Sequence, residues 1–337
     1  MARVCINPRV RGSGGMASFR LKFEDGLQAR GIQVTHDLDQ NSDAILLIAG
    51  SRQLLSLWKA RRRGVRLVQR LDGLNWVHRV RWSGFRYHLR GEYGNAMMAF
   101  LRARLADRVI YQSEFVRNWW QAWHGEASAP GRVILNGVDL KIYSPDGRST
   151  AAASDRRYRI LLIEGSLAGG LNTGLFHVSQ LAEMLAPRFP VEIVVAGQVD
   201  NRTRHRIQKA TSVPVEFLGV IERSRIPELA RSASLLYSAE INPPCPNSVI
   251  EALACGLPVL GFDTGSLGEL VTGEAGRIVP YGGDPWKLDQ PDIPALASAA
   301  AEILQDQGRF KTAARARAES AFGLNKMVDE YIKVLLE

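Results

Sequence analysis

The sequence predicts an α/β protein with two doubly wound, Rossmann-like domains, each built on a parallel sheet. Three observations support this prediction. The chain has 337 residues, which is more than one typical domain. Short apolar strands alternate with helical segments in both halves, as in parallel sheets. Between the halves, residues 144–157 are rich in small and polar types, which is typical of a linker.

The first half alternates between expected strands and helices. Phe19, Phe23 and Leu27 recur at helical spacing within an expected helix over 16–30. A second apolar helix is expected over 92–106. The expected strands are 3–7, 33–36, 44–49, 65–69 and 108–112. We therefore expect a first domain over residues 1–145.

The second half repeats the alternation after an expected linker over 146–157, so that a second domain spans 158–324. Its expected strands are 159–165, 191–197, 215–221, 234–239 and 259–262, and its helices are 173–185, 204–209 and 226–233. A last helix over 326–336, within a terminal segment 325–337, completes the chain.

Positive charge is concentrated in the first half. The net charge is +9, yet residues 1–150 hold 24 basic and 12 acidic residues, and the remainder holds 19 and 22. Segment 59–90 carries ten basic residues and one acid, Asp72, between aromatic side chains. This composition favours an anionic partner, either a phosphate-bearing acceptor or the headgroups of a membrane; solvated surface arginines are the alternative. Positive charge is the only feature of the sequence that favours nucleic-acid binding, and no nucleic-acid-binding motif accompanies it. We therefore expect no nucleic-acid partner.

The compartment is predicted from what the sequence lacks. No run of about 18 apolar residues and no charged-then-apolar leader is visible. Three scattered cysteines suit a reducing compartment better than a disulfide framework or a zinc site. We expect a cytoplasmic protein, with peripheral contact at the inner membrane face through 59–90 as an option.

The most informative segment is 240–271, where a helix follows a proline-rich loop. Glu251 lies one turn into this helix. The backbone N–H groups of Asn247, Ser248 and Val249 would sit at the positive end of the helix, where a diphosphate is stabilised. A carboxylate just inside can accept hydrogen bonds from ribose hydroxyls. An ordinary helix and strand of any α/β domain is the alternative.

Three motifs together resemble the retaining GT-B glycosyltransferases, in particular family 4. The first is EALACGLPV followed by TGSLGELV, over residues 251–271. The others are VIYQSEF at 109–115 and VILNGVD at 133–139, with Tyr143 and Pro145 closing the pattern. The resemblance implies two domains facing a cleft and a C-terminal helix that crosses back to the first domain.

The resemblance also implies an activity, the transfer of a hexose with retention from a nucleotide sugar. The donor would be a UDP- or GDP-sugar, with no further cofactor and no metal. The acceptor would be a glycan, a lipid-linked saccharide or a small phosphorylated molecule. Glu251 would hold ribose, and the glycine loops at Gly14, Gly15 and Gly165 would approach the donor.

The chain departs from the family pattern at two places. Pro243 occupies the position of the first of two glutamates, and Glu240 lies three residues too early to be assumed a substitute. The Arg and Lys expected after the first strand of the second domain are absent, because the chain reads GSLAGGLNT over 165–173. Arg70, Arg223 and Arg225 are other sources of positive charge. A GT-B-like binding or scaffold protein with weakened or lost catalysis is therefore the alternative.

The first domain contributes a candidate acceptor base, Asp72, which follows an expected strand and could orient or deprotonate an acceptor hydroxyl. Capping of the next turn is the other interpretation of Asp72. His78 and His88 are more often structural in such a segment. The glycines of loop 12–15, with Asp37, mimic a dinucleotide fingerprint, which makes an NAD-dependent enzyme a remote alternative.

Overall fold

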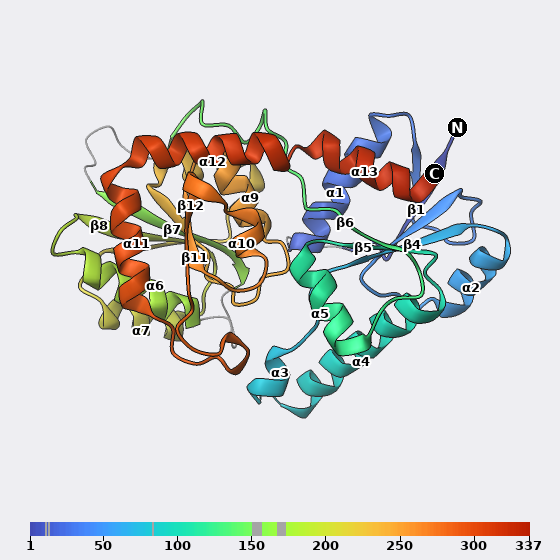
Figure 1. The fold of residues 1–337 in the computed structure, drawn as a ribbon, viewed down its shortest axis with the longest axis horizontal. Coiled ribbons are helices and arrows are strands. Elements are labelled where there is room, and N and C mark those ends of the chain that lie inside the picture. Colours follow the sequence, from blue (N-terminus) through green and yellow to red (C-terminus); the bar gives the residue numbers. More distant parts are fainter. Residues whose placement is uncertain (11, 13, 83, 150–156, 167–172) are drawn as a thin grey trace. The chain divides into compact units, whose positions relative to one another are not determined.

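The computed structural model describes the chain except residues 11, 13, 83, 150–156 and 167–172. It divides into two compact units (Figure 1), unit 1 of Met1–Gly137 with Leu324–Glu337, and unit 2 of Val138–Gly323. The first boundary therefore lies earlier than the expected residue 145. The reason is that Arg315 of unit 2 donates hydrogen bonds to the carbonyls of Leu140 (3.2 Å) and Tyr143 (2.9 Å), which hold that segment in unit 2.

Unit 1 is built on a parallel sheet of six strands in the order β2-β1-β3-β4-β5-β6. The five expected strands are present, and the short β6 was not expected. The bounds are β1 (Arg3–Asn7), β2 (Gln33–Thr35), β3 (Ala44–Ile48), β4 (Arg66–Leu71), β5 (Arg108–Tyr111) and β6 (Gly131–Val133). The central strand β3 is buried along its whole length, as its continuous apolar run predicts.

Helices cover this sheet, and the C-terminal helix is one of them. They are α1 (Gly15–Gln28), α2 (Leu54–Arg62), α4 (Phe85–Arg104), α5 (Glu114–His124) and α13 (Leu324–Leu336), whereas the short α3 (Val77–Val80) packs on α4. Figure 1 shows α13 beside α1, and the Tyr331 ring lies 5.2 Å from Phe19 and 5.1 Å from Phe23. The predicted return of the last helix to the first domain is thus confirmed.

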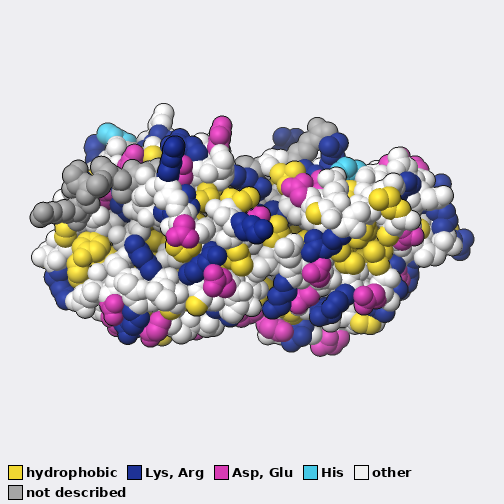
Figure 2. All heavy atoms as spheres, turned by 90° about the horizontal axis from the view of Figure 1, so that it is seen from above, with side chains coloured by type: hydrophobic (Ala, Val, Ile, Leu, Met, Phe, Trp, Pro, Cys, Tyr) yellow, Lys and Arg dark blue, Asp and Glu magenta, His cyan; other side chains and the backbone are white. Residues whose placement is uncertain are grey.

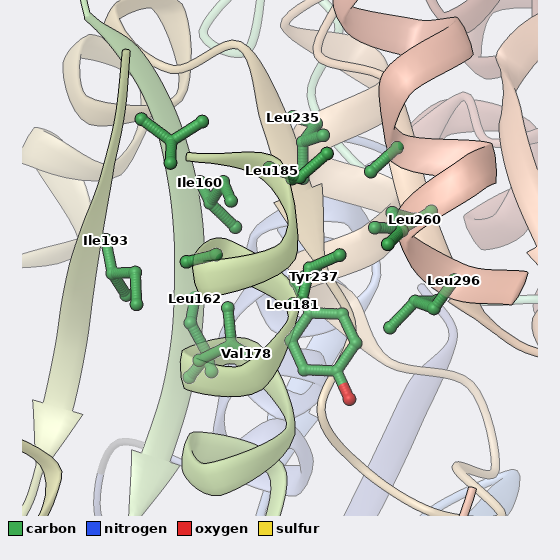
Figure 3. Packing of buried hydrophobic residues seen from close by; sticks show 14 of the residues in the cluster. Ile160, Leu162, Val178, Leu181, Leu185, Ile193, Leu235, Tyr237, Leu260 and Leu296 are labelled. Atoms are coloured by element: carbon green, nitrogen blue, oxygen red, sulfur yellow. The ribbon is translucent and has the colours of Figure 1, made fainter. Parts of the chain in front are cut away.

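Unit 2 carries the second parallel sheet, in the order β12-β11-β10-β7-β8-β9. The bounds are β7 (Tyr158–Ser166), β8 (Val191–Gln198), β9 (Val215–Gly219), β10 (Leu235–Tyr237), β11 (Val259–Phe262) and β12 (Gly276–Val279). Figure 3 shows its core, where Tyr237 and Leu260 from the sheet meet Leu181 of α6 and Leu296 of α11. The predicted α/β class with two parallel sheets is confirmed.

The helices of unit 2 connect these strands. They are α6 (Thr173–Leu185), α7 (Asn201–Ala210), α8 (Ile226–Ser232), α9 (Asn247–Ala254), α10 (Leu267–Leu270), α11 (Ile293–Gln305) and α12 (Gln307–Ala321). The order of strands reverses between β7 and β10, and in unit 1 between β1 and β3. In open α/β sheets ligands bind beyond the carboxyl ends of the strands at such switch points. The switch point of each unit is therefore where a ligand is expected to bind.

The surface has mixed charge. On the face drawn in Figure 2, Lys and Arg side chains are interspersed with Asp and Glu. In the part of the chain that the structure describes, no helix combines the length and the apolarity needed to cross a membrane.

Candidate functional site

The site in unit 2 begins at the amino end of α9, which starts after the proline-rich loop 243–246. Pro246 is the N-cap residue, and no side chain caps the helix there. The N–H groups of Asn247, Ser248 and Val249 have no partner within the helix, because the first turn lacks preceding carbonyls. The helix therefore presents unpaired donors and a partial positive charge, which suit a phosphate group.

Glu251 lies in the second turn of α9 and is only 4% exposed. Its neighbour is Tyr143, from the first segment of unit 2. Burial raises the pKa of the Tyr143 hydroxyl, and the Glu251 carboxylate, with which it shares a hydrogen bond, raises the pKa further. The Arg315 guanidinium holds both partners in place, because it donates to the carbonyls of Tyr143 (2.9 Å) and Ala254 (2.6 Å). The carboxylate predicted to hold ribose is thus fixed by Tyr143, which the sequence showed only as part of a family motif and not as a neighbour of Glu251.

Two further carboxyl groups lie at the switch point of unit 2. Glu164 is near the end of β7, and Glu240 follows the neighbouring parallel strand β10, so both occupy the carboxyl edge of the sheet. Burial raises the pKa of Glu164 to about 8, with a contribution from the negative charge of Glu240. The Glu164 carboxyl is therefore largely protonated at pH 7 and can donate a hydrogen bond.

Pro243 has a structural reason to occupy the position of the first family glutamate. It packs against Gly265, whose φ is +61°. A Cβ at Gly265 would lie 2.4 Å from Pro243 Cδ. The N–H of Ser266 also donates to the Pro243 carbonyl at 2.9 Å. The packing and the hydrogen bond of the buried Pro243 thus hold segment 240–246 against the turn at 264–266.

The glycine loops are placed at both switch points. Gly165 is exposed and has open space around its Cα, whereas the stretch 167–172, where the expected cations are missing, lies outside the described residues. In unit 1, Gly14 is the N-cap of α1 and Gly15 its first residue, again without a side-chain cap. The amino end of α1 and the amino end of α9 are thus similar: both lack a capping side chain.

Arg70 and Asp72 lie at the end of β4 in unit 1. Arg70 is only 1% exposed, donates to Tyr331 Oη (3.1 Å) and to Asn136 Oδ1 (2.9 Å), and lies over the Phe19 ring. Its buried guanidinium therefore ties α1 and α13 to the sheet, a packing role in addition to the positive charge expected of it. Asp72 is half-buried. Burial raises its carboxyl pKa, and the charge of Arg70 opposes the shift.

A cluster that the sequence did not predict lies at the C-terminal end of the basic segment 59–90 and extends to Glu92. His78, His88 and Glu92 each bring one metal-ligating atom to within 4.8 Å of the others. His78 Nε2 lies 2.9 Å from Glu92 Oε1, and Arg79 donates to both oxygens of Glu92. His88 and Glu92 are four residues apart, a helical spacing that could have revealed two of the three cluster residues.

The chain is similar to known sugar-transferring proteins. Residues 160–306 match the family model described as "Glycosyl transferases group 1". The lipopolysaccharide core biosynthesis mannosyltransferase LpsB of Rhizobium meliloti is 28% identical over 198 residues, which are 55% of this chain and 53% of LpsB. The GDP-mannose-dependent α-(1-6)-phosphatidylinositol dimannoside mannosyltransferase of Mycobacterium tuberculosis is 27% identical over 231 residues, 65% of this chain and 56% of that protein. The chain thus matches about half the length of these relatives.

Solved structures share the fold of the whole chain. Sucrose-phosphate synthase of Thermosynechococcus elongatus has a TM-score of 0.77 at 18% identity, covering 99% of this chain and 98% of that one. Anabaena HepE in complex with UDP-glucose has a TM-score of 0.69 at 17% identity, covering 99% and 100%. At this identity the likeness is one of fold.

Proposed function

We propose that this chain, which resembles the GT-B glycosyltransferases of family 4, transfers a hexose from a nucleotide sugar, with retention, to a saccharide or lipid-linked acceptor. The observation that carries the proposal is the amino end of α9, where uncapped amides precede the buried carboxylate of Glu251. This helix begins beside the β7–β10 switch point, and ligands of open α/β sheets commonly bind at such points.

The donor would bind in unit 2 through its nucleoside diphosphate. Amides of Asn247, Ser248 and Val249 would hold the diphosphate, and Glu251 would accept hydrogen bonds from the ribose hydroxyls. Because Gly14, Gly15 and Gly165 have no side chain, their backbone could come close to the donor. A UDP- or GDP-sugar is favoured, since one relative is named for GDP-mannose and one fold neighbour holds UDP-glucose.

Glu164 would compensate in part for the cations that the family pattern places after β7. An ionised carboxylate there would repel the leaving diphosphate. A carboxyl whose pKa is about 8 is mostly neutral at pH 7 and donates a hydrogen bond instead. The negative charge of Glu240 disfavours a second negative charge nearby, so Glu164 keeps its proton. The leaving diphosphate would take the acceptor proton on the same face of the sugar, so that the protein mainly positions donor and acceptor.

The acceptor would bind to unit 1. Asp72 would orient or deprotonate its hydroxyl, since a raised carboxyl pKa makes a stronger base. Helix α4 exposes Phe85, Leu89 and Tyr93 at a spacing of four residues, and Arg86 and Arg90 lie between them. An apolar stripe flanked by arginines suits an anionic membrane surface, where lipid-linked acceptors reside.

The proposal is tested by measuring release of nucleoside diphosphate from UDP-, GDP- and ADP-sugars, with and without extracted lipid-linked saccharides. We expect one nucleotide sugar to be turned over, and Asp72→Asn to lower the acceptor-dependent rate at least tenfold while donor binding stays. Vesicles with anionic lipids should bind the wild type, and high salt should release it.

The alternative function is a GT-B-like protein that binds a nucleotide sugar without transferring the sugar. Pro243 in place of the first glutamate favours it, because this loop residue is committed to packing on Gly265. Binding of a nucleotide sugar with neither hydrolysis nor transfer would decide for the alternative.

A further inference from the structure

We propose that His78, His88 and Glu92 in unit 1 form a site for a divalent transition-metal ion, and that zinc fits it best. His78 comes from α3, while His88 and Glu92 lie one turn apart on α4. One ligating atom of each residue lies within 4.8 Å of the other two. The inference is independent of glycosyl transfer, because none of the three residues belongs to the proposed donor or acceptor machinery.

The three ligating atoms favour one class of metal ion. Two imidazole nitrogens and one carboxylate oxygen form a borderline ligand set that suits zinc and leaves at least one coordination position open. Bonds of about 2.0–2.2 Å in a tetrahedron place ligand atoms about 3.3–3.5 Å apart. The 2.9 Å between His78 Nε2 and Glu92 Oε1 is close to that spacing. Zinc would replace the proton between these two atoms, and His88 would approach by rotation of its side chain.

One nitrogen of His88 lacks a hydrogen-bond partner, which favours an additional ion at this cluster. This nitrogen, Nδ1, is buried and has no hydrogen-bond partner among the residues that the structure describes. A buried polar atom without a partner costs about 1–3 kcal/mol, so such atoms call for an unseen water or ion. The His78 and His88 rings meet edge to face, with centroids 4.9 Å apart. The ring that carries the unpartnered nitrogen therefore packs against His78 within the same cluster.

Gly91 makes room for the cluster within α4. A Cβ at this position would lie 2.7 Å from both Nδ1 and Cε1 of His78. Glycine inside a helix costs about 1 kcal/mol relative to alanine. Here it allows the His78 ring to lie directly on the helix backbone, between the positions of His88 and Glu92. The close approach of His78 to α4 thus depends on Gly91, which has no side chain and does not itself coordinate the metal.

Arg79 both supports and weakens metal binding. It donates to Glu92 Oε1 at 2.6 Å and to Oε2 at 2.7 Å, which fixes the orientation of the carboxylate as partners of metal ligands commonly do. Its positive charge opposes a second cation, although its side chain is 44% exposed and solvent screens the charge. We therefore expect weaker zinc binding than at a closed structural site.

The test is a calorimetric titration of zinc chloride into metal-free protein that carries no polyhistidine tag. The wild type should bind one equivalent, and His88→Ala should weaken the affinity at least tenfold. His205→Ala is the matched control, because His205 is exposed on α7 and lies outside the cluster, and its zinc affinity should equal that of the wild type. No saturable binding by the wild type, or equal binding by His88→Ala, would overturn the proposal.

Gly91→Ala provides a second test that keeps all three ligands. The added methyl group displaces the His78 ring, so zinc binding should weaken at least tenfold while the helix content in circular dichroism is retained. If His88→Ala does not fold, this variant decides. Zinc affinity unchanged in a folded Gly91→Ala protein contradicts the proposed geometry.

Discussion

At the residue scale, the most consequential contact is that of Tyr143 with Glu251. Both side chains are almost fully buried, and 108 positions separate them in the sequence. The hydroxyl neighbours the Glu251 carboxylate, which in the proposed donor site would need a single orientation to meet two ribose hydroxyls. Arg315 fixes the backbone on both sides of the contact. Tyr143 is therefore a positioning residue for the proposed ribose contact.

Tyr143→Phe removes this hydroxyl without changing the packing of the ring. A hydrogen bond contributes about 0.5–1.5 kcal/mol, so nucleoside diphosphate should bind roughly 2- to 13-fold more weakly. Titration calorimetry measures the change. Tyr158→Phe, in the same unit but on β7 away from α9, is the matched control and should bind like the wild type. Equal affinities of the two variants would rule out the positioning role.

Glu164 predicts a dependence of stability on pH. Its pKa is about 8 in the folded protein against an ordinary value of 4.5. Between these values the folded state holds a proton that the unfolded state has lost, so the free energy of unfolding falls as pH rises from about 4.5 to 8. Glu164→Gln should remove this part of the fall.

The measurement is thermal unfolding of wild type and Glu164→Gln at pH 5 and pH 8. We expect the wild type to lose at least about 1 kcal/mol more than the variant, or about 2–4 °C in Tm. Glu216→Gln, at an exposed site on β9, controls for the loss of one negative charge. Parallel pH profiles of wild type and Glu164→Gln would disprove the raised pKa.

At the scale of elements, local pattern predicted strands and helices well, and contacts between distant segments remained invisible. Buried strands such as β3 and β8 follow from apolar runs. The start of α4 at Phe85 was missed, because Phe85, Leu89 and Tyr93 stay exposed and give no core periodicity. The pairing of Glu164 with Glu240 depends on which strands are neighbours in the sheet. One sequence contains no direct signal for such a pairing.

The loop before α9 gives a prediction at the same scale. Gly265→Ala should destabilise the protein by about 1–3 kcal/mol and weaken donor binding, because alanine at φ +61° also collides with Pro243. Denaturant unfolding measures the loss. Gly219→Ala is the control, since Gly219 has a φ of +68° and open space around it. Equal losses in both variants would mean that the Pro243 contact adds nothing.

At the scale of the whole molecule, the two units repeat one plan. Each has six parallel strands, one reversal of strand order, and a helix without a side-chain cap that begins beyond the sheet edge. The sequence showed this plan and the candidate Glu251. Two features escaped it: the boundary at Gly137, because Arg315 holds the next segment in unit 2 through backbone carbonyls, and the burial of Arg70.

The proposed donor site requires that unit 2 binds a nucleotide sugar at the amino end of α9. Titration calorimetry of wild type and Glu251→Gln against UDP and GDP tests it most directly, with far-UV circular dichroism to verify that both proteins are folded. We predict that the wild type binds one nucleotide and that the variant, which lacks the ribose-accepting carboxylate, binds it at least tenfold more weakly. Absence of binding by the wild type at millimolar nucleotide, or equal binding by the variant, would contradict the claim.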